Sequence, residues 1–204
     1  MNRAWLALID DQKEVREALG EMLRVFGYSV DLYSSATEFL AKPGARRAGC
    51  IVSDVRMPGI DGISFLRMLS ENSLTAPVIL ISGHADVPMA VEALKAGAFD
   101  FIEKPVDDVR LVASINRALA KNSEQLDQAR VTSELALRFE RLTPREAEVF
   151  DLVTRGLTNF GVADRLGISV RTVESYRAQI MEKMQADGLA TLVRQSIRLG
   201  RMPA

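Results

Sequence analysis

Five polar side chains near the ends of short apolar segments could together carry out phosphoryl chemistry. They are Asp10, Asp11, Asp54, Ser82 and Lys104. Carboxylates that lie close together repel one another unless a hard cation lies among them, and oxygen ligands of this kind suit Mg²⁺. A lysine supplies a positive point charge and a serine a hydroxyl donor, and both can hold the oxygens of a phosphoryl group carried by a carboxylate. Any one of these residues alone is as easily a solvated loop residue, so the prediction depends on all five being brought together.

The elements that must position these residues are short apolar segments separated by amphipathic stretches. Nearly continuous hydrophobic runs indicate strands of a parallel sheet covered on both faces, and the alternating run 28–33 indicates a strand nearer an edge. Apolar residues recur at helical spacing between the runs. We therefore predict a doubly wound α/β domain with a five-stranded parallel sheet, in which the carboxyl ends of the strands form the ligand crevice. The predicted strands are residues 4–9, 28–33, 50–53, 77–82 and 98–102.

Motifs at these positions resemble the signatures of a receiver domain of two-component response regulators, which has a flavodoxin-like or CheY-like fold. The matching segments are Asp10-Asp11, 53–62, Ser82-Gly83-His84 and Glu103-Lys104-Pro105, and the match spans residues 4–120. The resemblance implies that Asp54 accepts phosphate from a sensor histidine kinase. It also implies that Asp11, Asp54 and the backbone carbonyl of Arg56 bind Mg²⁺, with Asp10 acting through water.

The same resemblance implies further roles around the phosphoacceptor. Ser82 and Lys104 would contact the phosphoryl oxygens, and Lys104-Pro105 is expected to be a cis peptide bond, a form that only proline makes accessible. Ser82 and Phe101 match the family's switch residues, although packing on a strand face explains Phe101 equally well. His84, the only histidine, is hypothesised to act with Arg56 on how easily water reaches the acyl phosphate.

Two other classes of protein are weighed against this interpretation. Haloacid-dehalogenase-type phosphatases also use a strand-end aspartate as nucleophile beside Mg²⁺, with an acid/base aspartate two residues later. Gln12 and Arg56 occupy the corresponding positions here, which argues against an enzyme. A flavodoxin-like electron carrier shares the topology, but three acidic groups would repel a flavin phosphate.

The second half of the chain has a helical pattern. Residues 121–141 contain neither Gly nor Pro and are predicted to form a helical linker, either continuous with the preceding helix or broken in the polar stretch 121–125. Thr143, Pro144 and Glu146 then combine a capping hydroxyl, a proline at the first helical position and the glutamate of a capping box, so a helix must begin there. Three more helices are predicted at 159–165, from Ser169 to 184, and at 189–199.

The two middle helices of this all-helical domain form a predicted helix-turn-helix, joined by residues 166–169. In such a motif the second helix enters the major groove of DNA, where Arg contacts guanine or phosphate and Glu accepts from cytosine. The candidate DNA contacts are Arg171, Thr172, Glu174, Ser175, Arg177, Ala178 and Lys183. Segments 142–146, 156–159, 166–169, 171–174 and 181–184 resemble the LuxR-type helix-turn-helix domain. The whole chain therefore resembles response regulators of the FixJ/NarL type.

Two departures from that pattern leave a second interpretation open. Phe160-Gly161-Val162 stands where the family usually has Lys-Glu-Ile, which removes a cation near the DNA backbone, and Tyr176 replaces a usual histidine. A glycine inside a helix also costs up to about 1 kcal/mol. The alternative is a regulator that acts through protein contacts alone, with a degenerate DNA domain.

The resemblance also implies partners. Phosphorylated receivers of this family pair through a face that includes the helix after residue 85 and the strand 98–102, which predicts a homodimer on phosphorylation. The apolar side of the last helix would pair two DNA-binding domains, although it could equally be only internal core; its residues are Leu189, Leu192, Val193 and Ile197. Double-stranded promoter DNA is the expected target, and RNA polymerase is a further candidate partner.

Composition is consistent with two globular domains. Residues 1–120 carry 13 Lys/Arg against 16 Asp/Glu, whereas residues 141–204 carry 10 against 7, so an acidic half precedes a basic one. The single cysteine, Cys50, excludes an internal disulfide framework, and no apolar run approaches the roughly 18 residues of a membrane span. We expect a cytoplasmic protein without membrane contact, comprising a receiver domain at 1–120, a helical linker at 121–141 and a DNA-binding domain at 142–204.

Overall fold

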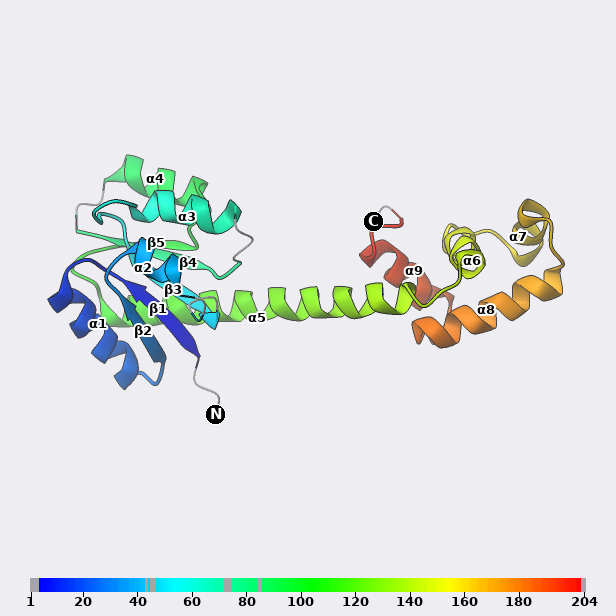
Figure 1. Cartoon of the computed structure of the whole chain (residues 1–204), viewed down its shortest axis with the longest axis horizontal. Helices are drawn as coiled ribbons and strands as arrows, with labels where there is room; N and C mark the ends of the chain where they lie inside the picture. Colours follow the sequence, from blue (N-terminus) through cyan, green and yellow to red (C-terminus); the bar gives the residue numbers. More distant parts are fainter. Residues whose placement is uncertain (1–3, 43, 45–46, 72–74, 84–85, 203–204) are drawn as a thin grey trace. The chain divides into compact units, whose positions relative to one another are not determined.

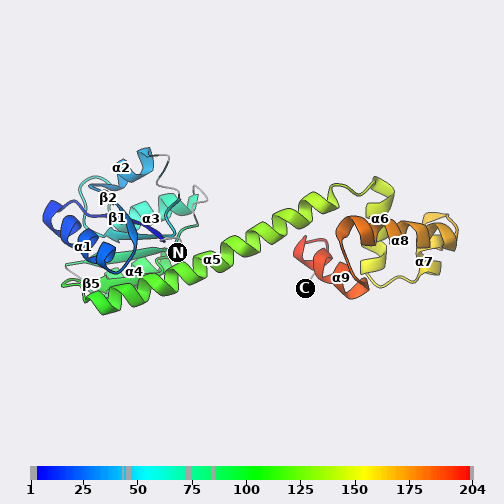
Figure 2. The ribbon, with the colours of Figure 1, turned by 90° about the horizontal axis from the view of Figure 1, so that it is seen from below.

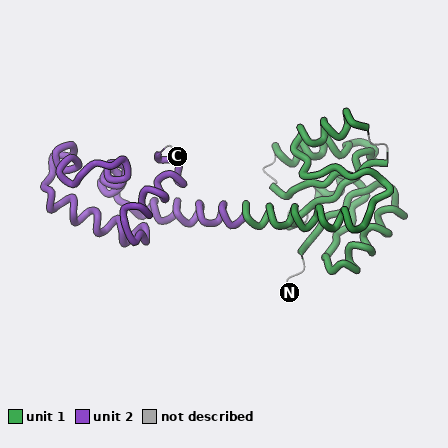
Figure 3. Tube along the Cα trace, turned by 180° about the vertical axis from the view of Figure 1, so that it is seen from behind, with its two compact units in different colours: residues 1–125 green, residues 126–204 purple. Residues whose placement is uncertain are grey.

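The computed structural model describes residues 4–42, 44, 47–71, 75–83 and 86–202, and the chain divides into two compact units (Figure 3). The first unit comprises residues 1–125 and the second residues 126–204. The first is an α/β domain and the second is helical, as the sequence predicts.

The sheet of the first unit has five parallel strands in the order β2-β1-β3-β4-β5 (Figure 1). The strands are β1 (Trp5–Ile9), β2 (Ser29–Tyr33), β3 (Cys50–Asp54), β4 (Val78–Ser82) and β5 (Asp100–Glu103). The alternating segment is the edge strand β2, which confirms its predicted position. The last strand begins two residues later than predicted, because residues 97 and 98 still belong to the end of the preceding helix. Gly97 adopts the left-handed conformation, and the Ala98 N–H donates to the Ala93 carbonyl.

Helices cover both faces of this sheet (Figures 1 and 2). Helix α1 (Lys13–Val25) and the first half of α5 (Asp108–Phe139) lie on one face, where Leu23, Leu111 and Ile115 are fully buried. The other face is covered by α2 (Ala36–Ala41), α3 (Gly62–Glu71) and α4 (Val87–Lys95), which bury Phe39, Phe65 and Ala93. Burying each large apolar side chain contributes about 1.5–3 kcal/mol, so the two layers hold the strand ends in place.

Cys50 lies at the start of β3 and is fully buried in the core shared by α1 and α5. Burial raises the pKa of its thiol to about 12. The side chain therefore serves as a small core residue, as its place in an apolar run predicts.

Helix α5 is continuous over 32 residues, so the polar stretch 121–125 is helical and does not break it. Its first half supplies Leu111 and Ile115 to the core of the first unit. In the second unit Leu135 is buried, and the Phe139 ring packs edge-on against Phe150 at 5.3 Å between ring centroids.

The second unit contains the four helices that the sequence predicts, with bounds within one or two residues. They are α6 (Pro144–Thr154), α7 (Asn159–Leu166), α8 (Val170–Met184) and α9 (Leu189–Arg198). Thr143 and Glu146 form the predicted capping box, Ser169 accepts from the Thr172 N–H, and Gly167 ends α7 in the left-handed region. The buried core includes Val149, Phe150, Val153, Val162, Val173, Ile180 and Met184.

Ser35 and Glu38 have the residue types and spacing of a capping box, but only part of the box forms. The Ser35 hydroxyl accepts from the Glu38 N–H at 3.1 Å, as expected of a cap. The Glu38 carboxylate, however, accepts from the Ser34 N–H and hydroxyl, each at 2.7 Å, while Lys42 binds its other oxygen. Ser34 offers two donors where Ser35 would offer one, which explains the difference.

Candidate functional site: an acidic pocket and a recognition helix

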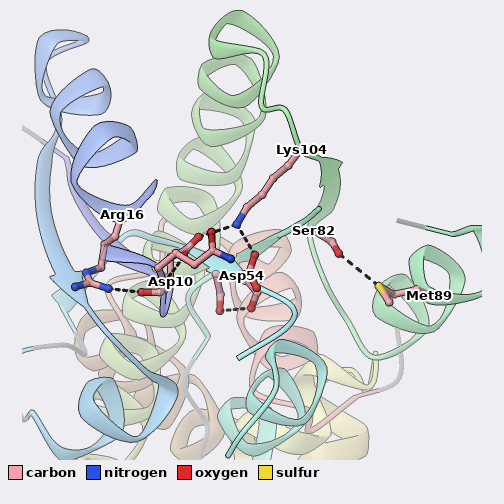
Figure 4. Close-up of polar contacts among 8 residues, drawn as sticks. Asp10, Arg16, Asp54, Ser82, Met89 and Lys104 are labelled. Carbon is pink, nitrogen blue, oxygen red and sulfur yellow. Dashed lines mark hydrogen bonds and ion pairs between the residues drawn. The ribbon is translucent and has the colours of Figure 1, made fainter. Parts of the chain in front are cut away.

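Three of the predicted pocket residues form one buried ionic cluster (Figure 4). Lys104 Nζ lies 2.8 Å from an oxygen of Asp10 and 2.6 Å from an oxygen of Asp54. Both carboxylate residues are buried, at 0% and 5% exposure. The cluster joins residues that follow β1, end β3 and follow β5, as the sequence predicts for the carboxyl edge of a parallel sheet.

The register of the sheet explains why these residues meet. Ile9 lies opposite Ser53 and Ser82 opposite Glu103, so the strands end at nearly the same level. The Lys104 N–H donates to the Ser82 carbonyl at 2.8 Å, which extends the ladder past the end of β5. The Lys104–Pro105 peptide bond is cis, as predicted.

The charges of this cluster do not balance, because two carboxylates share one ammonium group. Burial raises the pKa of Asp54 above its ordinary value, and the hydrogen bond from Lys104 only partly offsets this effect. Burial alone would lower the pKa of Lys104, but its bonds to Asp10 and Asp54 leave it raised. The pocket thus carries an excess negative charge next to an ammonium group that stays protonated.

Asp11 and Arg56 lie beside this cluster rather than in it. Both line a cavity of about 930 Å³, together with Met57, Asp61 and Met89. Within the described ranges, no three carboxylate, histidine or cysteine side chains are grouped closely enough to hold a metal ion. Asp11 is therefore set apart from the two buried carboxylates that Lys104 contacts.

The predicted switch residues lie on neighbouring strands. The Ser82 hydroxyl, 1% exposed, donates to Met89 Sδ of α4 at 3.7 Å (Figure 4). Phe101 is half-buried and packs against the core beneath α4. His84 lies outside the described residues.

Four residues that the sequence prediction did not assign to the pocket help to shape it. The Gln12 N–H donates to the Asp10 side chain at 2.9 Å, and the Arg16 guanidinium donates to the Asp10 backbone carbonyl at 2.5 Å. Gly62 packs so closely that a Cβ there would lie 2.5 Å from the Asp54 carbonyl oxygen. Its place in the 53–62 motif was a signal for this contact, whereas nothing local indicated Arg16 or Met89.

The predicted recognition helix α8 presents most of its candidate DNA contacts to solvent. Arg171, Glu174, Ser175 and Ala178 are exposed, and Thr172 and Arg177 are half-buried. The Arg177 guanidinium donates to the Asn159 side chain at 2.7 Å, which ties α8 to the start of α7.

Lys183 lies apart from that polar face. Its Nζ contacts both carboxylate oxygens of Glu146, at 2.7 and 2.6 Å, and Glu146 is 1% exposed. Burial would raise the pKa of Glu146, but the bonds from Lys183 and Thr143 lower it below its ordinary value. Lys183 therefore joins α8 to α6 within the domain.

Comparisons with known proteins identify both domains. Residues 6–116 match the model of the response regulator receiver domain, and residues 140–196 match that of the bacterial regulatory proteins of the luxR family. The chain is 44% identical over 197 residues to the transcriptional regulatory protein FixJ of Azorhizobium caulinodans, covering 97% of this chain and 93% of that protein. It is 41% identical over 192 residues to the tetrathionate response regulatory protein TtrR of Salmonella typhimurium, covering 94% and 91%. The solved structure of the response regulator StyR aligns with a TM-score of 0.82 at 36% identity, covering 95% and 98%.

The fold and the pocket thus define a receiver domain joined to a helix-turn-helix domain, which is the architecture of a protein that regulates transcription. The chain belongs to the two-component response regulators with a LuxR-type DNA-binding domain, as the sequence resemblance predicts. Its relatives are transcription regulators, and the receiver domain implies a sensor kinase as a partner. No helix among the described residues is long and apolar enough to cross a membrane.

Proposed function

We propose that Asp54 is the phosphoacceptor of this response regulator and that its phosphorylation by a sensor histidine kinase switches DNA binding. A carboxylate oxygen of Asp54 attacks the phosphorus of a phosphohistidine, an acyl phosphate bond forms, and the phosphorus–nitrogen bond breaks with its electron pair returning to the imidazole. The observation that carries the proposal is the buried Asp54 carboxylate 2.6 Å from Lys104 Nζ. After transfer, this ammonium group is placed to bind a phosphoryl oxygen.

The residues present are of the chemical types that bind a divalent cation. Asp10 and Asp54 are buried with one shared ammonium group, and Asp11 lines the adjoining cavity with Arg56, whose backbone carbonyl is a further proposed ligand. Mg²⁺ would neutralise the excess negative charge and stabilise charge on the transferring phosphoryl group. Asp11, Asp54 and the Arg56 carbonyl would hold it, with Asp10 acting through water.

The switch we propose begins at Ser82. A new phosphoryl group on Asp54 offers charged oxygens to the Ser82 hydroxyl, which in this structure donates to Met89 of α4. Charged acceptors form stronger hydrogen bonds than a thioether, so the hydroxyl would leave α4. Phe101, packed beneath α4, would follow by changing its rotamer.

The output we propose is a homodimer on adjacent DNA half-sites. Three apolar residues of α4, Val87, Val91 and Leu94, are 77%, 43% and 52% exposed and would be covered when two receivers pair. In the DNA-binding domain, Leu192 is core whereas Leu189 at the start of α9 is 42% exposed, so α9 has a residue left for pairing. The exposed face of α8 would read promoter DNA. We therefore propose a cytoplasmic location, and RNA polymerase is a further proposed partner.

The phosphorylation proposal is tested with acetyl phosphate as the phosphodonor and a phosphate-affinity gel as the readout. We expect the full-length chain to gain one phosphate in Mg²⁺ and none in EDTA. Asp54→Ala should gain none in either condition, whereas Asp127→Ala, which removes an exposed carboxylate of α5, should behave as wild type. Equal labelling of Asp54→Ala would refute the assignment.

DNA binding is tested by gel shift of genomic fragments with phosphorylated and unphosphorylated chain across a salt series. Phosphate contacts make binding weaken steeply with salt, and phosphorylation should strengthen it. Arg171→Ala should weaken binding, by about 1–3 kcal/mol where it contacts a base, whereas Arg155→Ala, directly after the end of α6, should not.

One observation favours the alternative of a regulator acting through protein contacts. Phe160, at the start of α7, is 74% exposed where the family usually has a lysine. If no fragment is bound in a salt-sensitive way by the phosphorylated chain, this alternative replaces DNA binding as the output.

A further inference from the structure

A cavity of about 540 Å³ lies within the second unit, between the C-terminal half of α5 and helix α9. The function proposed above does not use it. Its apolar lining comes from Val131, Leu135 and Ile197, and its charged lining from Arg138, Arg194 and Arg198. The volume is within the range of about 300–1,000 Å³ that small-molecule sites occupy.

The charged residues that line this cavity are all arginines. Arg194 donates to the Thr191 hydroxyl at 2.9 Å, and the nearby carboxylate of Asp187, which Thr191 also contacts, partly balances its charge. Within the ranges that the structure describes, Arg138 and Arg198 have no acidic side chain within 4 Å. Two guanidinium groups without an ion-pair partner at one cavity create a potential that attracts an anion.

Gln195 gives an independent indication of a ligand site. It lines the same cavity, is 8% exposed, and donates through Nε2 to the Met184 carbonyl at 3.1 Å. Its Oε1 is one of two buried side-chain atoms that lack a hydrogen-bond partner in the described part of the chain. Buried acceptors are nearly always satisfied, so a hydroxyl or N–H donor that the bound molecule carries in addition to its anionic group would complete this residue.

We propose that this cavity binds an organic anion with an apolar body. The arginines would bind a carboxylate, sulfonate or phosphate head group, and Val131, Leu135 and Ile197 would contact the body. A second copy of the chain is a poorer occupant, because a two-fold contact through this face would bring three arginines against three arginines.

The test uses the full-length chain and the fluorescent sulfonate 1-anilinonaphthalene-8-sulfonate as the probe. Decanoate should displace the probe, whereas inorganic phosphate, which lacks a body, and decanol, which lacks a charge, should not at the same concentration. The double variant Arg138→Gln/Arg198→Gln should bind decanoate about tenfold more weakly or worse, equivalent to 1.4 kcal/mol. Val131→Trp, which fills the cavity, should lower the affinity as well.

The matched control is Arg130→Gln/Arg155→Gln, which removes the same charge from residues that do not line the cavity. It should bind decanoate as wild type does. Unchanged affinity in the cavity double variant, equal weakening in the two double variants, or displacement by decanol as effective as by decanoate would each overturn the proposal. Because the arginines are not on α8, loss of decanoate binding can be separated from loss of DNA binding.

Discussion

Each domain of this response regulator pairs buried carboxylates with a partly exposed lysine, but the two clusters differ in charge balance. In the receiver, Asp10 and Asp54 share Lys104, and burial raises the pKa of Asp54. In the helical domain, Glu146 has Lys183 to itself and also accepts from the Thr143 N–H, so its pKa is lowered. A balanced cluster stabilises a fold, whereas an unbalanced one is prepared for a further cation or a phosphoryl group.

The largest expected effect is on the balanced pair. Lys183→Met leaves Glu146 as an unpaired buried carboxylate and should lower the free energy of unfolding of the helical domain by about 3 kcal/mol. Calorimetry of the full chain measures it. The double variant Glu146→Gln/Lys183→Met should recover part of the loss, and DNA affinity of the folded protein should change little. Intact stability with weakened DNA binding would instead make Lys183 a DNA contact.

The unbalanced cluster should respond to Mg²⁺ where the balanced one does not. A ligand that binds only the folded state at 100 times its Kd stabilises it by about 2.7 kcal/mol. Wild type should show a Mg²⁺-dependent rise of the receiver's unfolding temperature, and Asp54→Asn should start higher without Mg²⁺ and gain little from it. If Mg²⁺ raises the unfolding temperature of Asp54→Asn as much as that of wild type, the Asp54 carboxylate does not belong to the cation site. Asp127→Asn is the control and should respond to Mg²⁺ as wild type does.

The pocket should also be sensitive to backbone packing. Gly62→Ala places a Cβ 2.5 Å from the Asp54 carbonyl oxygen, and relieving that overlap should cost about 1–3 kcal/mol of stability. Gly161→Ala is the contrasting change, since a Cβ there meets its nearest neighbour at 3.6 Å and helix propensity should add up to about 1 kcal/mol. Chemical denaturation of both variants measures the difference, and equal effects would contradict the close packing at Gly62.

The smallest effect expected is the dependence on pH. A carboxylate whose pKa is lowered by folding stabilises the fold above its ordinary pKa of 4.5, and this contribution is lost as the pH falls below that value. Asp54 acts in the opposite direction, because its raised pKa means that ionisation costs stability as the pH rises. Glu146→Gln should therefore reduce the fall in the unfolding temperature of the helical domain as the pH is lowered, whereas Asp54→Asn should not. Measuring the unfolding temperatures of both variants between pH 3 and 6 tests this.

The same contrast explains how far the sequence could be interpreted. Thr143 and Glu146 lie three residues apart, so their capping box was predictable from local chemistry. The partner of Glu146 is 37 residues away on another helix, and no local pattern indicates this pair. That Lys183 also contacts DNA stays a prediction. The receiver cluster was predictable at longer range only because parallel strands bring their carboxyl ends together.

Where two neighbouring residues could bind the same side chain, the sequence does not show which of them does. Glu38 binds Ser34 rather than Ser35, since both residues precede the same helix and only the structure shows which donors reach the carboxylate. The course of α5 was likewise left open between a continuous and a broken helix. Its polar middle has no helix-breaking residue, and the structure is helical throughout.

The burial of Cys50 has a practical consequence for labelling. Alkylating reagents react with the thiolate, and a thiol with a pKa of about 12 in a closed core offers almost none at neutral pH. A new cysteine on an exposed position of α4 or α8 would thus be modified alone, with the native residue left in place. Fluorophores or spin labels attached there can report receiver pairing and DNA docking on an otherwise unaltered chain.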